Sequence, residues 1–166
     1  MVKDIKAIDV LKDYWKTFDP LKNVPIPVGD IAQKLGIYVW VQSFEKNYNR
    51  DKSGYLEIAG DVSVIYINEK DHPYRQRFTI AHELAHFLTY PEVMEHAVYR
   101  DDRFAHYPEE RQANNFASEF LMPGDLIRRE YRELVFPTVS DLAKKFQVSN
   151  RAMESRLKRL KLRLNK

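Results

Sequence analysis

Two histidines and a glutamate lie close together in the segment RFTIAHELAHFLTY, residues 77–90. His82 and His86 are four residues apart, and on a helix such side chains lie one above the other, so both imidazoles can reach one point. Two neutral imidazole nitrogens suit a tetrahedral zinc ion, with bonds of about 2.0–2.1 Å. Glu83 lies about 100° further round the helix, where it can act as a general base without binding the metal. This H-E-x-x-H pattern predicts a zinc site with hydrolytic chemistry.

The residues around this pattern are apolar. They are Phe78, Ile80, Ala81, Leu84, Ala85, Phe87 and Leu88. Burying a carboxylate in such a helix costs several kcal/mol unless a cation or hydrogen bonds compensate for the lost hydration. Because a bound metal ion supplies this compensation, the sequence favours metal binding over an accidental match to the pattern.

A third protein ligand for zinc has three candidates. Glu92 lies six residues after the second histidine, as in the longer H-E-x-x-H-x-x-G-x-x-H pattern, but Thr89 replaces the glycine of that pattern. His96 lies in a segment without periodicity and stays a candidate. Glu110 lies in EERQANNFASEFLMPGD, residues 109–125, and is the preferred one.

Glu110 is preferred because it lies on the apolar stripe of a predicted helix. That stripe repeats at the spacing of a core-facing helix and consists of Ala113, Phe116, Ala117, Phe120 and Leu121. Glu110 continues it three residues earlier, and Asn114 one turn later could bond the outer nitrogen of a ligand histidine. Alternatively, Glu110 only stabilises the helix N-terminus, a role that suits Glu109 better.

The elements that must position these residues follow from hydrophobic periodicity and turn residues. The expected helices cover residues 4–18, 28–35, 75–89, 109–121 and 124–132, with two short helices at the end of the chain. Strands are expected at 37–44 and, divided at Gly60, within 55–68; residues 47–54 are a predicted turn and 92–108 are predicted to be irregular. The predicted fold class is α+β, with a small mixed or antiparallel sheet followed by helices.

The 166 residues, 44% of them apolar, can form one domain with a substantial core. We expect residues 1–137 to form the domain with the zinc site, on which the helices of residues 138–166 pack. No stretch reaches the roughly 18 apolar residues of a membrane span, and the N-terminus lacks the apolar centre of a secretory signal. Without cysteines, thiolate metal sites and disulfides are excluded, and a cytoplasmic protein is expected.

The C-terminal segment is strongly basic and resembles a helix-turn-helix. Residues 144–166 hold nine Lys or Arg and one Glu, although the whole chain has a net charge of only +3. One hypothesis is DNA contact by Arg151, Arg156 and Arg159. The preferred hypothesis is that these helices pack on the domain with the zinc site or dock the protein on which that site acts.

The two segments QRFTIAHELAHFL and ERQANNFASEFLMP closely resemble the ImmA/IrrE family of zinc metallo-endopeptidases, and the likeness extends over roughly residues 24–160. The resemblance implies a zincin-like fold, with His82, His86 and Glu110 as zinc ligands and Glu83 as the general base. Ala85 and Gln112 depart from residues common in the family, but neither departure removes a ligand.

Family members cleave transcriptional repressors, so the resemblance implies derepression of genes of a mobile element or a stress response. Manganese or another divalent ion is an alternative to zinc. The alternative function is a DNA-binding or partner-binding regulator with a non-catalytic zinc site, although a structural zinc normally has four protein ligands.

Two further features of the substrate site are expected. A second electrophile should come from the loop between the two motif helices, where the candidates are Tyr90, His96, Tyr99, His106 and Tyr107. Strand 62–68 is predicted to be an edge strand to which an extended substrate could add.

Overall fold

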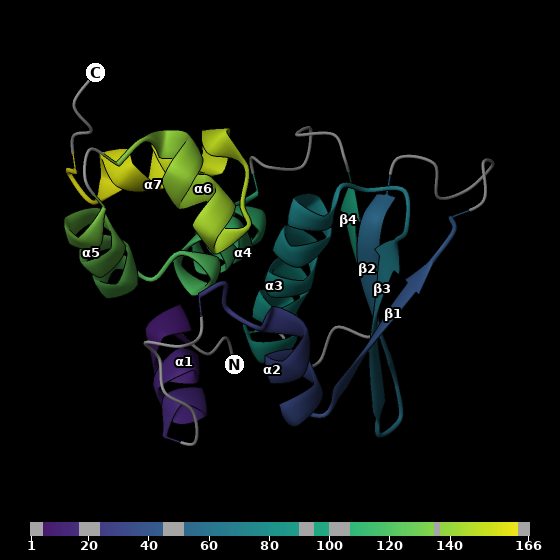
Figure 1. The fold of residues 1–166 in the computed structure, drawn as a ribbon. Helices are drawn as coiled ribbons and strands as arrows, with labels where there is room; N and C mark the ends of the chain where they lie inside the picture. The colour runs from purple at the N-terminus through teal and green to yellow at the C-terminus, as the bar shows by residue number, and fades with distance from the viewer. Residues whose placement is uncertain are drawn as a thin grey trace.

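Within the residues that the structure describes, the sheet has four strands, and helices cover one of its faces (Figure 1). The structure is a computed structural model that describes residues 5–16, 24–44, 52–89, 95–99, 107–134 and 137–162. The strands are β1 (Ile37–Gln42), β2 (Lys52–Ala59), β3 (Val62–Asn68) and β4 (Glu95–Tyr99). Their order in the sheet is β1-β3-β2-β4, with β1 parallel to β3 and the other pairs antiparallel. The predicted α+β class with a small mixed sheet is confirmed.

The helices occur close to where the hydrophobic pattern predicts them. Their bounds are α1 Ala7–Trp15, α2 Val28–Lys34, α3 Pro73–Thr89, α4 Pro108–Leu121, α5 Gly124–Glu133, α6 Val139–Phe146 and α7 Asn150–Arg159. Helix α3 begins two residues before the predicted start, at Pro73, whose missing N–H is not needed in a first helical turn. Among the described residues, no helix is long and apolar enough to cross a membrane.

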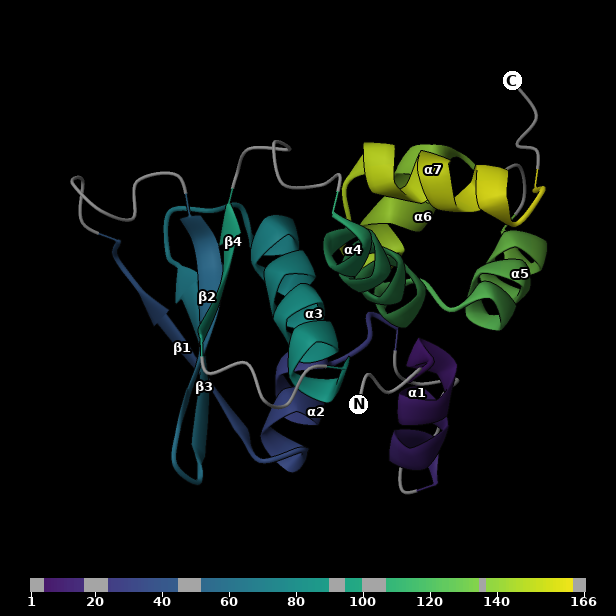
Figure 2. The ribbon, with the colours of Figure 1, turned by 180° about the vertical axis from the view of Figure 1, so that it is seen from behind.

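Helix α3 lies between the sheet and helices α1 and α4–α7, whereas α2 lies beside α3 and also contacts β1 (Figures 1 and 2). Alternate residues of the strands, including Leu56 and Ile65, face the core and are fully buried. On α3, Ala81 and Leu84 are also fully buried, because the helix packs against the sheet on one side and α4 on the other. Functional side chains in the middle of α3 are therefore enclosed on two sides.

Three predictions about the strands are wrong. The polar segment 47–54 does not end as a turn, since β2 already begins at Lys52. Residues 92–108 are not wholly irregular, because Glu95–Tyr99 form β4. Strand 62–68 is not an edge: β3 pairs with β1 on one side and β2 on the other, so the edges of the sheet are β1 and β4. Strand order depends on pairing between distant segments, which hydrophobic alternation does not reveal.

Gly54 allows β2 to approach α3 closely, so Gly54→Ala should lower the free energy of unfolding by about 2 kcal/mol. A Cβ at this position would lie 2.5 Å from the Tyr66 carbonyl oxygen and 2.6 Å from Thr79 Cγ2. Gly29→Ala is the matched control: nothing lies within 4 Å of its Cβ position in α2, and alanine there should stabilise by roughly 0.5–1 kcal/mol. Urea unfolding measures both variants, and equal stability of the two would contradict the close approach.

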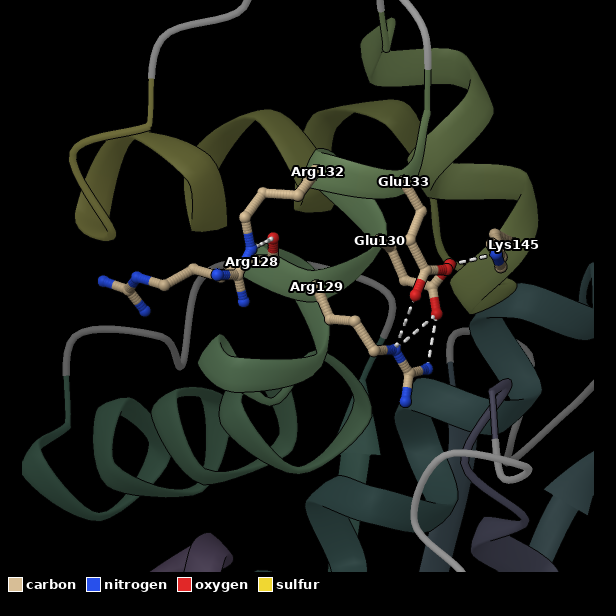
Figure 3. Close-up of polar contacts among 6 residues, drawn as sticks. All are labelled: Arg128, Arg129, Glu130, Arg132, Glu133 and Lys145. Carbon is tan, nitrogen blue, oxygen red and sulfur yellow. Dashed lines mark hydrogen bonds and ion pairs between the residues drawn. The ribbon is translucent and has the colours of Figure 1, made fainter.

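A buried carboxylate joins α5 to α6, as Figure 3 shows. Glu130 forms ion pairs with Arg129 of its own helix and with Lys145 of α6. Burial alone would raise the pKa of Glu130, but the hydrogen bonds from Lys145 and Arg129 outweigh it, and the pKa is lowered. The ionised form of Glu130 therefore stabilises the contact between these helices.

The pH dependence of stability should reveal this carboxylate. Because the folded-state pKa of Glu130 is below its unfolded value, its contribution is present at neutral pH and is lost as the pH falls through the carboxyl range. Glu130→Gln should lower the free energy of unfolding at pH 7 by about 1–2 kcal/mol, a difference that disappears toward pH ~3. Glu133→Gln, at an exposed neighbouring position, should change it by less than about 0.5 kcal/mol. A pH-independent difference in urea unfolding would contradict this assignment.

Helix α7 is attached to α4 through two of the arginines that were considered for DNA contact. Arg156 is 7% exposed; its Nε donates to the Met122 carbonyl oxygen and its guanidinium pairs with Glu119. Burial lowers the pKa of this guanidinium. Arg159 donates to Asn115 Oδ1 at 2.6 Å. Both side chains thus make contacts within the protein, as the packing hypothesis requires. The domain division between residues 137 and 138 stays a prediction.

Candidate metal centre

Helix α3 holds the H-E-x-x-H residues inside the protein. His82, Glu83 and His86 are 1%, 0% and 3% exposed. The helix forms there because Ala81, Leu84 and Ala85 pack on the core and leave room for neighbouring elements to approach closely. Polar side chains so deeply buried require partners, and α4 supplies Asn114 to His82 and Glu110 to both histidines.

Three side-chain atoms that can bind a metal converge between α3 and α4. Nε2 of His82 lies 3.1 Å from Nε2 of His86. The carboxylate of Glu110 is 3.2 Å from Nε2 of His82 and 3.3 Å from Nε2 of His86. Within the described residues, these three side chains form a group that could hold a metal ion. The structure therefore brings together the three residues that the sequence selected as ligands, although their binding of a metal stays a prediction.

These distances fit a tetrahedral zinc site. Two ligand atoms bound to one ion at about 2.0–2.1 Å, at the tetrahedral angle, lie about 3.3–3.4 Å apart. The observed separations of 3.1–3.3 Å are close to that value. A small movement of the three side chains away from one another would complete the tetrahedral geometry, so these residues fit a zinc ion.

Asn114 fixes the orientation of the His82 ring. Its Oδ1 lies 3.0 Å from Nδ1 of His82. A carboxamide oxygen only accepts hydrogen bonds, so Nδ1 donates its proton and Nε2 keeps a lone pair that could bind a metal ion. The contact between Asn114 and a ligand histidine, predicted from the position of Asn114 one turn after Glu110, is present.

Glu83 lies beside the ligand group on the same helix and is completely buried. Apolar core residues of α3 flank Glu83 in the sequence, and a low-dielectric environment strengthens interactions of a carboxylate with nearby charge. This arrangement can support proton transfer next to a metal ion, which is the chemistry that the sequence predicts for Glu83.

The other predicted candidates are less well placed or lie outside the described residues. Glu92, Tyr90 and His106 lie outside the described residues. His96 and Tyr99 belong to β4, of which only the backbone is described. Tyr107 precedes α4 and is 59% exposed. The choice of a second electrophile therefore stays open.

Sequence reasoning did not single out Phe78 as a site residue. Its ring centroid lies 6.1 Å from that of His82, one helical turn away on α3. The sequence could have indicated this contact, because Phe78 and His82 are four residues apart and such residues share one face of a helix. Phe78 was interpreted only as a core residue.

The family model of the peptidase M78 family, described as the IrrE N-terminal-like domain, matches residues 32–158. The chain belongs to the M78 peptidase family. The predicted resemblance to ImmA/IrrE proteins is thereby confirmed, and the fold is that of a zincin-like M78 domain. Membership indicates a metallopeptidase linked to regulators, and the His-His-Glu group between α3 and α4 agrees with that chemistry.

Among solved structures, this M78 chain is similar to a Mycobacterium tuberculosis transcriptional regulator. The two share 19% sequence identity with a TM-score of 0.59, over 91% of this chain and 46% of the regulator. The chain thus spans about half the length of that regulator, and the similarity shows a shared fold. No curated protein sequence matches the chain.

Proposed function

We propose that this protein is a zinc-dependent endopeptidase that cleaves a DNA-binding transcriptional repressor, so that genes of a mobile element or a stress response are expressed. The observation that carries the proposal is the convergence of His82, His86 and Glu110 next to the buried Glu83. Membership of the M78 family supports metallopeptidase chemistry linked to regulators. Since a repressor acts on the chromosome, we expect the reaction to take place in the cytoplasm.

Zinc is the proposed ion because two imidazoles and one carboxylate are a ligand set that catalytic zinc sites use. His82, His86 and Glu110 would hold it, and Asn114 would keep the His82 imidazole in the required tautomer. When bound, the ion lowers the pKa of a bound water to about 7 and polarises a carbonyl group. Manganese or another divalent ion is the alternative.

Glu83 is the proposed general base and acid. Its carboxylate accepts a proton from the attacking water and returns it to the amine that leaves when the peptide bond breaks. The two residues on either side of Glu83 in the sequence, His82 and Leu84, are buried, so the carboxylate is held on a rigid turn of α3. Such fixed placement is what a proton-transfer group requires.

A DNA-binding or partner-binding regulator with a non-catalytic metal site is the second candidate. Arg151, exposed on the basic helix α7, is the feature that favours it. Against it, Arg156 and Arg159 make contacts with α4. Duplex DNA shifted in a gel at physiological salt, with weaker binding as salt increases, would support this candidate.

The proposed function can be tested on the product of a neighbouring gene that encodes a helix-turn-helix repressor. Incubation of that repressor with the zinc-loaded protein should give two fragments whose masses define one cleaved bond. A chelator should stop the reaction, and zinc or manganese added back in separate reactions identifies the active ion. A repressor that stays intact at full zinc occupancy, across the repressors encoded nearby, would contradict the proposal.

A further inference from the structure

A cavity of about 800 Å³ lies between the first turns of α3, the end of α4 and the first turns of α7. The cavity begins next to the candidate metal centre, because two of its lining residues, Phe78 and Asn114, lie against the His82 ring. Helix α7 forms its opposite wall with Arg151 and Ser155. The C-terminal helices thus take part in a cavity that leads away from the predicted catalytic residues.

The position of the cavity matches that of a substrate side chain near the cleaved bond. Phe78 and Arg75 precede His82 by four and seven residues, which corresponds to about 6 Å and 10 Å along the helix axis. An extended peptide advances about 3.3 Å per residue. A peptide whose cleaved bond lies at the metal centre would therefore place its second or third residue from that bond in the cavity.

The charge of the cavity is one-sided. The guanidinium of Arg75 is positioned by a hydrogen bond from its Nε to Ser53 Oγ (3.1 Å) and lies 5.6 Å from the Phe78 ring centroid. Arg151 is exposed on the opposite wall, in the first turn of α7, where the helix dipole adds further positive potential. Among the described residues that line the cavity, none is Asp or Glu.

The floor of the cavity is apolar and is formed by residues such as Leu121, Met122 and Val148. An apolar floor below two guanidinium groups suits a side chain that has both a hydrocarbon stem and a negative charge. Glutamate combines both features, and aspartate does so with a shorter stem. A positively charged side chain would be repelled by both walls.

We infer that this cavity is a specificity subsite that accepts an acidic side chain of the substrate, two or three residues from the cleaved bond, with Arg151 as a residue that determines the preference. The inference rests on the proposed function, since it places a peptide across the metal centre. It assigns the basic helix α7 to recognition of an acidic protein segment, with Arg151 facing the peptide.

The test uses peptide binding and does not depend on cleavage. Random dodecapeptides displayed on phage are selected on the zinc-loaded Glu83→Gln protein, and the same selection is made with Arg151→Glu added. A glutamate in the first turn of α7 is favoured by the helix dipole, so this variant should fold. Lys158→Glu is the matched control, because Lys158 is on the same helix, is 76% exposed and does not line the cavity.

We expect acidic residues to be enriched at one fixed position of the selected peptides. In fluorescence anisotropy, Arg151→Glu should weaken binding of the best peptide by about fivefold, and Lys158→Glu by less than about twofold. When the enriched Glu of the peptide is replaced with Gln, the proteins with and without Arg151→Glu should bind the peptide with equal affinity. Three results would overturn the inference. The selection could yield no peptide, it could yield peptides without an acidic residue, or Arg151→Glu could leave the affinity for the peptide unchanged.

Two further outcomes distinguish this inference from the proposed function. If the wild-type zinc-loaded protein binds the acidic peptides but does not cut them, the peptidase proposal fails and the acidic subsite stands. If it cuts peptides equally well with and without acidic residues, the peptidase proposal stands and the acidic subsite fails. Duplex DNA that displaces the peptides and loses affinity on Arg151→Glu would overturn the peptide assignment in favour of phosphate recognition.

Discussion

Glu83→Gln is expected to retain one zinc ion per chain and to lower the rate of peptide cleavage by about 10²–10⁴-fold. Glutamine has the shape of glutamate, so the fully buried position is filled without a cavity. Its amide, however, cannot accept the proton of the attacking water. Zinc content by elemental analysis and cleavage under single-turnover conditions measure the two effects separately.

The control for this variant is Glu57→Gln, which removes an exposed carboxylate from β2. It should cleave at the wild-type rate, because it changes the net charge equally without touching α3. Wild-type cleavage by Glu83→Gln would show that another group takes the proton. A loss of zinc in that variant would instead mean that Glu83 supports the ligands.

Glu110→Ala is expected to weaken zinc binding by at least about 100-fold, since loss of a ligand costs more than loss of the residue that orients one. The carboxylate is the one contribution of α4 to the ligand group, so the variant leaves two imidazoles. A ligand that binds the native state stabilises it by about 4 kcal/mol at a thousand times its Kd. The rise in Tm on addition of zinc should therefore largely disappear with Glu110→Ala.

Glu109→Ala is the matched control, because this neighbouring carboxylate is exposed in the first turn of α4. Its removal should lower stability slightly and equally with and without zinc. Calorimetric titration of both variants gives their zinc affinities. If Glu109→Ala and Glu110→Ala bind zinc equally well, the third ligand must come from elsewhere in the chain.

The convergence of His82, His86 and Glu110 was predictable from sequence because its geometry is mostly local. The spacing of His82 and His86 fixes their relation on any helix, and the apolar stripe of residues 109–121 orients Glu110 toward the core. The contact of Asn114 with His82 followed from the same helical spacing. Only the pairing of the two helices was non-local, and the family resemblance supplied it.

The sheet was less predictable because its pairing is non-local. Strand β4 is short and contains Glu95 and His96, so its sequence gives no clear alternation. Strand β3 is central because β1, an earlier segment of the chain, pairs with it in parallel. Likewise, the inward orientation of Arg156 depends on the Met122 carbonyl oxygen, 34 residues away, whereas composition alone places arginine on the surface.

Helix α4 contributes both to the candidate metal centre and to the attachment of α7. Its first turn carries Glu110, and its far end holds Arg156 of α7 through Glu119 and the adjoining Met122 carbonyl. The fourteen residues of α4 form a helix about 21 Å long. A helix of this length moves as a rigid body, so a movement at one end also displaces the other end. An outward displacement of α7 would therefore be passed along α4 to its first turn, where it would change the distances of 3.2 Å and 3.3 Å between the Glu110 carboxylate and the two histidines.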